Sequence, residues 1–313
     1  MSSESTDSIA QGLKEFFNSK SIVKDYATAD RATGPPARAM LHQAGLSSES
    51  LRADGKYDSE YEVLDNACGP GVVTALLYEE LKEVRSAGGE SGGVKMKVKV
   101  VCGDLSSPMV ESMKERLGNF EGLEAQAREL NGQALDLPSN HFTHVLTNFG
   151  FQSFTDPLAG IRESVRVAKP GGTIAMTNWI RPGWASALHV AISRIPGAPR
   201  SLPASWPFPP DAARTKLGDA AWTREQLERI PEVDPASIRV EEHSFVMALR
   251  TDEEARELVR PLEKMLDAFT GGWSEEEREA CGGGKLVDGV VKAIVEEPEL
   301  VWRSLVTTVL KRV

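Results

Sequence analysis

Short apolar runs alternate with longer stretches of helical periodicity between about residues 60 and 180. This alternation is typical of a parallel sheet with helices on both faces. Buried strands are predicted by apolar and β-branched runs at 61–65, 94–104, 142–149, 173–179, 238–249 and 305–313. The pattern therefore predicts a doubly wound, mostly parallel α/β sheet.

Several helix boundaries can also be predicted. Asp156 followed by Pro157 predicts a capping carboxylate and the first turn of a helix. Lys-Pro-Gly-Gly at 169–172 should end that helix and turn the chain into the next strand. Two further helix starts are predicted at 223–226, which has a capping-box pattern, and at 251–254.

The same patterns divide the chain into four parts. Residues 1–60 lack a strand signal and predict an N-terminal helical cap, and 61–180 hold the core of the sheet. Tryptophans and prolines are frequent in 181–235, which we interpret as a lid or substrate insertion after the fifth strand. The rest, 236–313, should complete the sheet and add helices.

Charge and composition narrow the function classes. The 313 residues include 46 acidic and 36 basic side chains, a formal net charge of −10 that disfavours nucleic acid. The three cysteines are widely spaced, which predicts neither disulfides nor a metal site. No apolar run reaches membrane-spanning length and no secretory signal is evident, so we expect a cytoplasmic protein with a small-molecule substrate.

A glycine turn directly follows the first predicted strand. Gly69 and Gly71 allow backbone amides to approach a ligand, which a β-carbon would obstruct. The carboxylate of Asp65 precedes this turn and would repel a diphosphate, and Thr74 stands where a dinucleotide fingerprint has its third glycine. A sulfonium or ammonium group would be compatible with that carboxylate.

A second acidic residue ends the next predicted strand. Asp104 can accept hydrogen bonds from both hydroxyls of a ribose, and Met109, one turn later, can pack against a purine. Ribose recognition without phosphate-binding residues favours S-adenosylmethionine (SAM) over NAD or ATP.

Four segments carry a resemblance to a known family: DNACGPG at 65–71, CGDLS at 102–106, THV at 143–145 and FGFQSF at 149–154. They resemble the class I SAM-dependent methyltransferases of fungal secondary metabolism, above all the gliotoxin-type thiol methyltransferases. The resemblance implies a Rossmann-like sheet of seven strands and a reaction that releases S-adenosylhomocysteine. Its motifs cover about 20–180, and the C-terminal third is only loosely similar.

The resemblance also implies which residues surround the cofactor. The segment 65–71 would enclose its methionine part, Asp104 and Leu105 the ribose and adenine, and the segment 148–150 would border the methyl group. Tyr26 and Thr33 match residues of the N-terminal cap in the family. The expected cofactor-binding residues are Tyr26, Asp65, Asn66, Ala67, Gly69, Gly71, Asp104, Leu105, Met109, Asn131, Gly132, Gln133, Asn148, Phe149 and Gly150.

One departure from the family concerns the adenine loop. Many class I enzymes place Asp in or near it, whereas this chain has only the amides of Asn131 and Gln133. An amide carbonyl can still accept a hydrogen bond from the exocyclic amine.

Contacts with the methyl acceptor are expected from Thr33, Phe151, Trp179 and Trp184. Trp206 and Phe208 could extend the same apolar wall, although aromatic residues are equally common in cores and lids. Catalytic candidates are Tyr26, His189 and His243, with alignment weighing more than acid–base chemistry, and a structural role is the alternative for each histidine.

The acceptor atom is left open by the sequence. The resemblance favours S-methylation of a thiol or dithiol. A thiol with a pKa of about 8.5 also needs no strong base. The alternatives are O- or N-methylation of a phenolic, carboxylate or indole metabolite, and a non-catalytic SAM-binding partner in a biosynthetic complex. We expect a monomer or a homodimer.

Overall fold

The fold was analysed in a computed structural model of the 313-residue chain. The parts that the structure describes are residues 17, 19, 21–25, 30–53, 59–87, 96–200, 202, 213–270 and 272–313.

One seven-stranded sheet forms the centre of the described chain, in the order β3-β2-β1-β4-β5-β7-β6. The strands are β1 (Glu60–Asn66), β2 (Lys97–Asp104), β3 (Glu124–Glu129), β4 (Phe142–Asn148), β5 (Ala168–Arg181), β6 (Arg239–Ala248) and β7 (Glu299–Leu310). The first five strands are parallel, and β7 runs antiparallel to both β5 and β6. The prediction of a doubly wound, mostly parallel sheet is confirmed.

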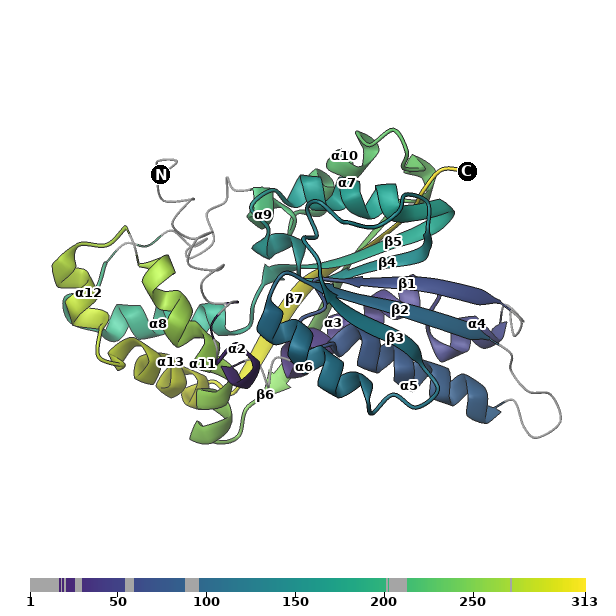
Figure 1. Ribbon diagram of the computed structural model, residues 1–313. Helices are drawn as coiled ribbons and strands as arrows, with labels where there is room; N and C mark the ends of the chain where they lie inside the picture. Colours follow the sequence, from purple (N-terminus) through teal and green to yellow (C-terminus); the bar gives the residue numbers. More distant parts are fainter. Residues whose placement is uncertain are drawn as a thin grey trace.

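Helices cover both faces of this sheet, and Figure 1 shows α7 and α10 on one side with α3 and α5 on the other. The helices are α2 (Ile22–Asp25), α3 (Asp30–Gln43), α4 (Ser48–Ala53), α5 (Val72–Ala87), α6 (Ser107–Leu117), α7 (Pro157–Val167), α8 (Trp184–Arg194), α9 (Ala213–Lys216), α10 (Ala220–Glu228), α11 (Asp252–Phe269), α12 (Glu275–Cys281) and α13 (Lys285–Glu296), with 3-10 turns η1 (Phe151–Ser153) and η2 (Pro235–Ser237). The helices α8, α11, α12 and α13 gather at one end of the molecule (Figure 1).

Each face has its own buried cluster. Val63, Leu146 and Val306 pack beneath α3 and α5, whereas Val145 and Ile174 pack beneath α7. A third cluster joins α8, α11 and α13 around Trp302 of β7. Apolar burial is the main driving force of folding, so β7 ties the end group of helices to the sheet.

Two predicted helix starts are confirmed. The Asp156 carboxylate accepts a hydrogen bond from the Ala159 amide and Pro157 begins α7, as predicted. The helix predicted from 251–254 begins at Asp252.

Two other predicted boundaries are wrong. The helix predicted to begin at 223–226 instead begins at Ala220, because the Asp219 side chain caps it through the Trp222 amide. The helix α7 does end before 169–172, at Val167, as predicted, but β5 begins already at Ala168 and includes 169–172, where its register against β4 shifts.

Among the described residues no helix combines the length and the apolar character needed to cross a membrane.

Candidate functional site

A cavity of about 340 Å³ opens where β1, β2 and β4 end at the same edge of the sheet. This edge is the usual ligand position in doubly wound sheets, and the volume falls in the small-molecule range of about 300–1,000 Å³. The described lining consists of Phe17, Asp30, Thr33, Ala67, Cys68, Gly69, Pro70, Val72, Asp104, Leu105, Ser106, Met109, Leu130, Asn131, Gly132, Gln133, Asn148, Phe149, Gly150, Ser153, Phe154 and Thr155.

The turn after β1 is held in an unusual backbone conformation. Ala67 has a φ of +57°, in the left-handed region that L side chains rarely adopt. At Gly71, where φ is +90°, a β-carbon would lie 2.1 Å from the sulfur of Met113. A strained backbone conformation persists only where the surrounding structure holds it in place, and such conformations are frequent at binding sites.

Asp104 fixes this turn to the end of β2. Its carboxylate accepts hydrogen bonds from the amides of Gly69 at 2.8 Å and Ser106 at 2.9 Å. Burial raises the pKa of Asp104, and the backbone hydrogen bonds partly oppose that shift. A carboxylate has about four acceptor positions, so Asp104 retains acceptor capacity toward the cavity.

Asp65 lies beneath the turn and outside the described lining. Thr74 donates to one of its oxygens through the hydroxyl at 2.7 Å and the amide at 3.2 Å, while the other oxygen is buried without a partner. Burial raises the pKa of Asp65 to about 6. The same burial and both carboxylates raise the pKa of the Cys68 thiol, which makes it a poor nucleophile.

The loop 131–133, which is predicted to contact the adenine, differs from the expectation in one respect. The carbonyl oxygen of Gln133 accepts hydrogen bonds from Thr155 and from the Asp156 amide, which occupy both of its lone pairs. The side-chain oxygen of Asn131 accepts one hydrogen bond, from the Gln133 amide. Between these two amides, only Asn131 keeps a free acceptor position.

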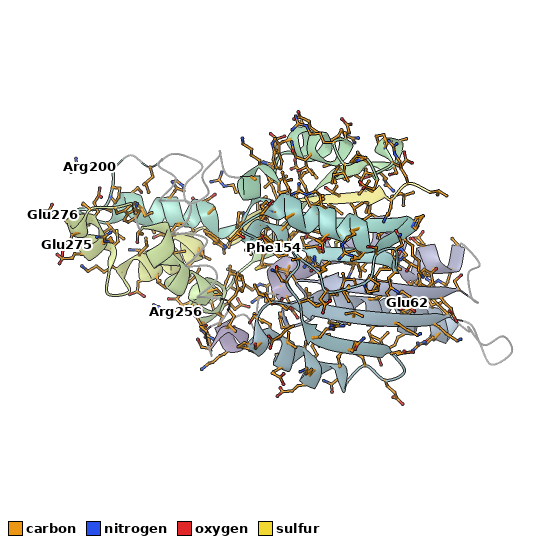
Figure 2. All side chains as sticks on the ribbon, turned by 45° about the horizontal axis from the view of Figure 1, so that its top comes forward. Glu62, Phe154, Arg200, Arg256, Glu275 and Glu276 are labelled. Atoms are coloured by element: carbon orange, nitrogen blue, oxygen red, sulfur yellow. The ribbon has the colours of Figure 1, made fainter. Side chains whose placement is uncertain are left out.

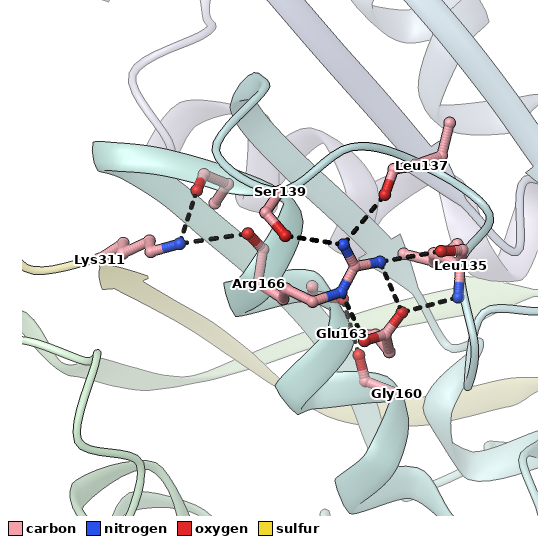
Figure 3. A network of polar contacts seen from close by, with 9 residues as sticks. Leu135, Leu137, Ser139, Gly160, Glu163, Arg166 and Lys311 are labelled. Carbon is pink, nitrogen blue, oxygen red and sulfur yellow. Dashed lines mark hydrogen bonds and ion pairs between the residues drawn. The ribbon is translucent and has the colours of Figure 1, made fainter.

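Arg166 holds the continuation of this loop against α7 (Figure 3). Its guanidinium donates to the carbonyl oxygens of Leu135 and Leu137 at 2.8 and 3.0 Å and to the Ser139 hydroxyl at 3.0 Å. It also pairs with Glu163, which accepts a hydrogen bond from the Leu135 amide. The planar five-donor group thereby fixes the loop that begins at the cavity.

The third wall follows β4. Phe149 has a φ of +59°, and its amide donates to both oxygens of Thr177 on β5, each at 3.1 Å. The Asn148 amide group donates to the carbonyl oxygen of Thr33 at 3.4 Å. This wall therefore joins β5 and the N-terminal helix α3 to one side of the cavity.

Comparisons with known proteins agree with this architecture. Residues 46–190 match the model of the ubiE/COQ5 methyltransferase family. The chain is 29% identical to methyltransferase tpcH of Aspergillus fumigatus, over 85% of this chain and 86% of that protein. It is 26% identical to acetylaranotin bis-thiomethyltransferase of Aspergillus terreus, over 86% and 84% of the two chains. These matches show that the chain is a SAM-dependent methyltransferase.

Solved structures similar to this methyltransferase are more distant in sequence. The YcgJ protein of Bacillus subtilis has a TM-score of 0.46 at 12% identity and covers 81% of this chain and 93% of its own. A putative methyltransferase of Bacillus halodurans has a TM-score of 0.45 at 15% identity and covers 85% and 99%.

The described residues of this methyltransferase fit SAM in chemistry as well as in volume. The same lining contains the carboxylate of Asp104, which can accept hydrogen bonds from the ribose hydroxyls, and the apolar side chains of Met109 and Leu130, which can pack against the adenine. Both polar atoms of the Asn66 side chain are buried without a partner next to Gly132. A β-carbon at Gly132 would lie 2.5 Å from Phe154, so the glycine keeps this side of the cavity open.

The predicted site residues divide into three groups. The described lining includes Thr33 and these expected cofactor residues: Ala67, Gly69, Asp104, Leu105, Met109, Asn131, Gly132, Gln133, Asn148, Phe149 and Gly150. It does not include Asp65, Asn66, Gly71, Phe151, Trp179, Trp184, His189 or His243. Tyr26, Trp206 and Phe208 lie outside the described residues.

The residues of the second group have other surroundings. Phe151 is fully buried in the cluster beneath α7, and Trp184 packs in the cluster of the end helices. Trp179 stacks on Phe149 from outside the cavity. His243, on β6, lines a separate shallow groove beside Arg31 and His42.

Sequence reasoning missed several lining residues. One of them is Phe154, which is labelled near the middle of the molecule in Figure 2. It belongs to the segment 149–154 that carried the family resemblance, which was its only signal. Phe17 and Asp30 had none, because the approach of the N-terminal helices to the cavity is a tertiary contact.

Proposed function

We propose that this methyltransferase transfers the methyl group of SAM to a sulfur atom of a small-molecule thiol or dithiol, a fungal-type secondary metabolite. The observation that carries the proposal is chemical: the titratable side chains in the described lining are Asp30, Cys68 and Asp104, with no histidine, lysine or tyrosine. A thiol with a pKa of about 8.5 ionises sufficiently without such a base, whereas a phenol near 10 does not.

The name of the Aspergillus terreus relative, acetylaranotin bis-thiomethyltransferase, supports the same acceptor atom. SAM supplies an electrophilic methyl group on a sulfonium centre, so the protein contributes mainly alignment and exclusion of water. In this proposal Asp104 and Leu105 hold the ribose and adenine, and Asn148, Phe149 and Gly150 border the reacting side.

The proposal also covers the cellular setting and the assembly. The net charge of −10 favours a small-molecule acceptor over nucleic acid. We place the reaction in the cytoplasm. The protein acts as a monomer or a homodimer.

The test is mass spectrometry of products formed from SAM and a panel of reduced dithiol diketopiperazines, simple thiols, phenols and indole amines. The proposal predicts a gain of one or two methyl groups on the thiols, and a rate that follows the ionisation of the acceptor. Methylation confined to phenols or amines would overturn the choice of sulfur. Binding of SAM without transfer to any acceptor would favour a non-catalytic partner.

A further inference from the structure

The wall of the cavity that follows β4 depends on a pair of aromatic rings. Phe149 stacks on Trp179 with ring centroids 3.8 Å apart and ring planes 11° apart. Phe149 faces the cavity from a left-handed backbone conformation that is unfavourable for a bulky residue. Such a conformation persists only where neighbouring groups hold it.

The indole of Trp179 is supported from its other side. Trp302 of β7 lies 5.2 Å away between ring centroids, at an angle of 52°, and in turn stacks parallel to Phe245 of β6 at 6.1 Å. Four aromatic rings therefore connect the cavity wall to the cluster of the end helices. The position of Trp179 sets the position of the ring that faces the cavity.

Gln152 holds the backbone of Trp179 directly. Its amide nitrogen donates to the Trp179 carbonyl oxygen at 3.0 Å, and its amide oxygen accepts from the Trp179 amide at 2.7 Å. The ladder between β4 and β5 ends at the pair Asn148 and Thr177, two residues earlier on β5. The Gln152 side chain thus takes the place of a peptide group in a continued β4.

At neutral pH a carboxamide can make both of these bonds, and the ionised side chain of a glutamate cannot. A planar amide offers one donor and one acceptor side by side, as a peptide group does, whereas an ionised carboxylate only accepts. Gln152 is part of η1 and does not belong to the described cavity lining.

We propose that Gln152 is a positioning residue for the methyl acceptor: it fixes Trp179, and through it the Phe149 ring that faces the acceptor. This inference rests on the proposed function for the location of the acceptor beside Phe149. It assigns to Gln152 a larger effect on the acceptor than on the binding of SAM, which Phe149 borders only on the side of the methyl group.

The test compares Gln152→Glu with Gln152→Met, which has a similar size and makes neither bond. At pH 8 both variants should lose about 10- to 100-fold in kcat/KM for the acceptor, the range of a lost buried hydrogen bond. The Kd for SAM should stay within twofold of the wild-type value. Near-ultraviolet circular dichroism should show a weakened signal from the stacked rings.

Lowering the pH distinguishes positioning from general structural support. The carboxyl group introduced by Gln152→Glu can, once protonated, again donate to the Trp179 carbonyl. At pH 4, below the ordinary pKa of about 4.3 for a glutamic acid side chain, this variant should therefore regain the dichroism signal and most of the activity relative to wild type. Gln152→Met should regain neither. Gln226→Glu, on α10 away from the cavity, controls for the added charge and should match the wild type throughout.

Three results would overturn the inference: a wild-type dichroism signal in Gln152→Met, a loss of SAM affinity as large as the loss in kcat/KM, or no recovery of Gln152→Glu at low pH. The dichroism and the Kd do not require turnover. If the wild type methylates no acceptor, the proposed function fails. The two hydrogen bonds from Gln152 to the backbone of Trp179 are still tested by the pH dependence of the dichroism signal of Gln152→Glu.

Discussion

Two buried carboxylates stand at the ends of adjacent strands, and their partners give them different roles. Asp104 contacts the cavity and holds the glycine turn through the Gly69 amide. Asp65 lies below that turn, bonded to Thr74, with one oxygen unpartnered. An unpartnered buried oxygen is tolerable as a neutral acid and unfavourable as an anion.

Ionisation of Asp65 should therefore reduce stability. Its pKa rises from the ordinary 3.8 to about 6 on folding. The protonated side chain therefore contributes to the free energy of unfolding in full below pH 3.8, and this contribution is lost as the pH rises through about 6. Relative to the isosteric Asp65→Asn, wild-type unfolding free energy should fall by about 2 kcal/mol between pH 4.5 and pH 7. Urea unfolding of both proteins at both pH values measures this, and an unchanged difference would contradict it.

Gly132 provides a test of the cavity shape. Its replacement by alanine would place a β-carbon 2.5 Å from Phe154 and 2.7 Å from the Asn66 side-chain oxygen, so one wall must shift into the cavity. We expect Gly132→Ala to weaken SAM binding about tenfold or more, in line with the ~1–3 kcal/mol of overpacking. Gly34→Ala, where nothing lies within 4 Å, is the control and should bind like the wild type.

Most strands of the sheet were predictable, whereas the edge strand β3 and the first half of β7 were not. Six strands were predicted from apolar runs, and four of them, β1, β2, β4 and β5, are central parallel strands, which are buried on both faces. The strand β3, with the sequence EAQARE, was missed because it lies at the edge of the sheet and has mostly exposed side chains. The first half of β7 was missed as well, since Arg303 and Ser304 interrupt the apolar run before Leu305.

The site was predictable only where it follows strand ends. The turn after β1 and Asp104 after β2 both lie where sequence order fixes the ends of parallel strands. Trp179 and Trp184 are aromatic residues of the kind expected to contact the acceptor. Which aromatic ring faces the cavity, however, depends on packing between segments that are distant in the sequence. The described lining does not include His189 or His243, because their positions also depend on packing between distant segments.

The loop between β3 and β4 depends on one helix side chain. Arg166→Lys should lower the unfolding free energy by about 1–3 kcal/mol, because a lysine cannot reach several carbonyls at once and leaves them without partners. Arg162→Lys on the same helix is the control, since Arg162 is exposed and pairs with Asp156 at 3.6 Å. Its effect should stay within about 0.5 kcal/mol. Equal losses in the two variants would refute the role of Arg166.

For the whole molecule, the last strand is a central structural element. β7 lies between β5 and β6 and contributes Trp302, Val306 and Val309 to three different clusters. A chain that ends at Pro298 should lose cooperative thermal unfolding, because β6 has no other strand partner in the described sheet. A sharp wild-type transition in differential scanning calorimetry of this truncated chain would contradict that view.

We expect the cavity at the ends of β1, β2 and β4 to hold SAM through Asp104. The most direct measurement is calorimetric titration of SAM into the wild type and into Asp104→Asn, after thermal unfolding has confirmed that both are folded. We expect one binding site per wild-type chain and an affinity about 5- to 100-fold lower in Asp104→Asn, because one acceptor oxygen for the ribose hydroxyls is replaced by a donor. Equal affinities for the two proteins would contradict it.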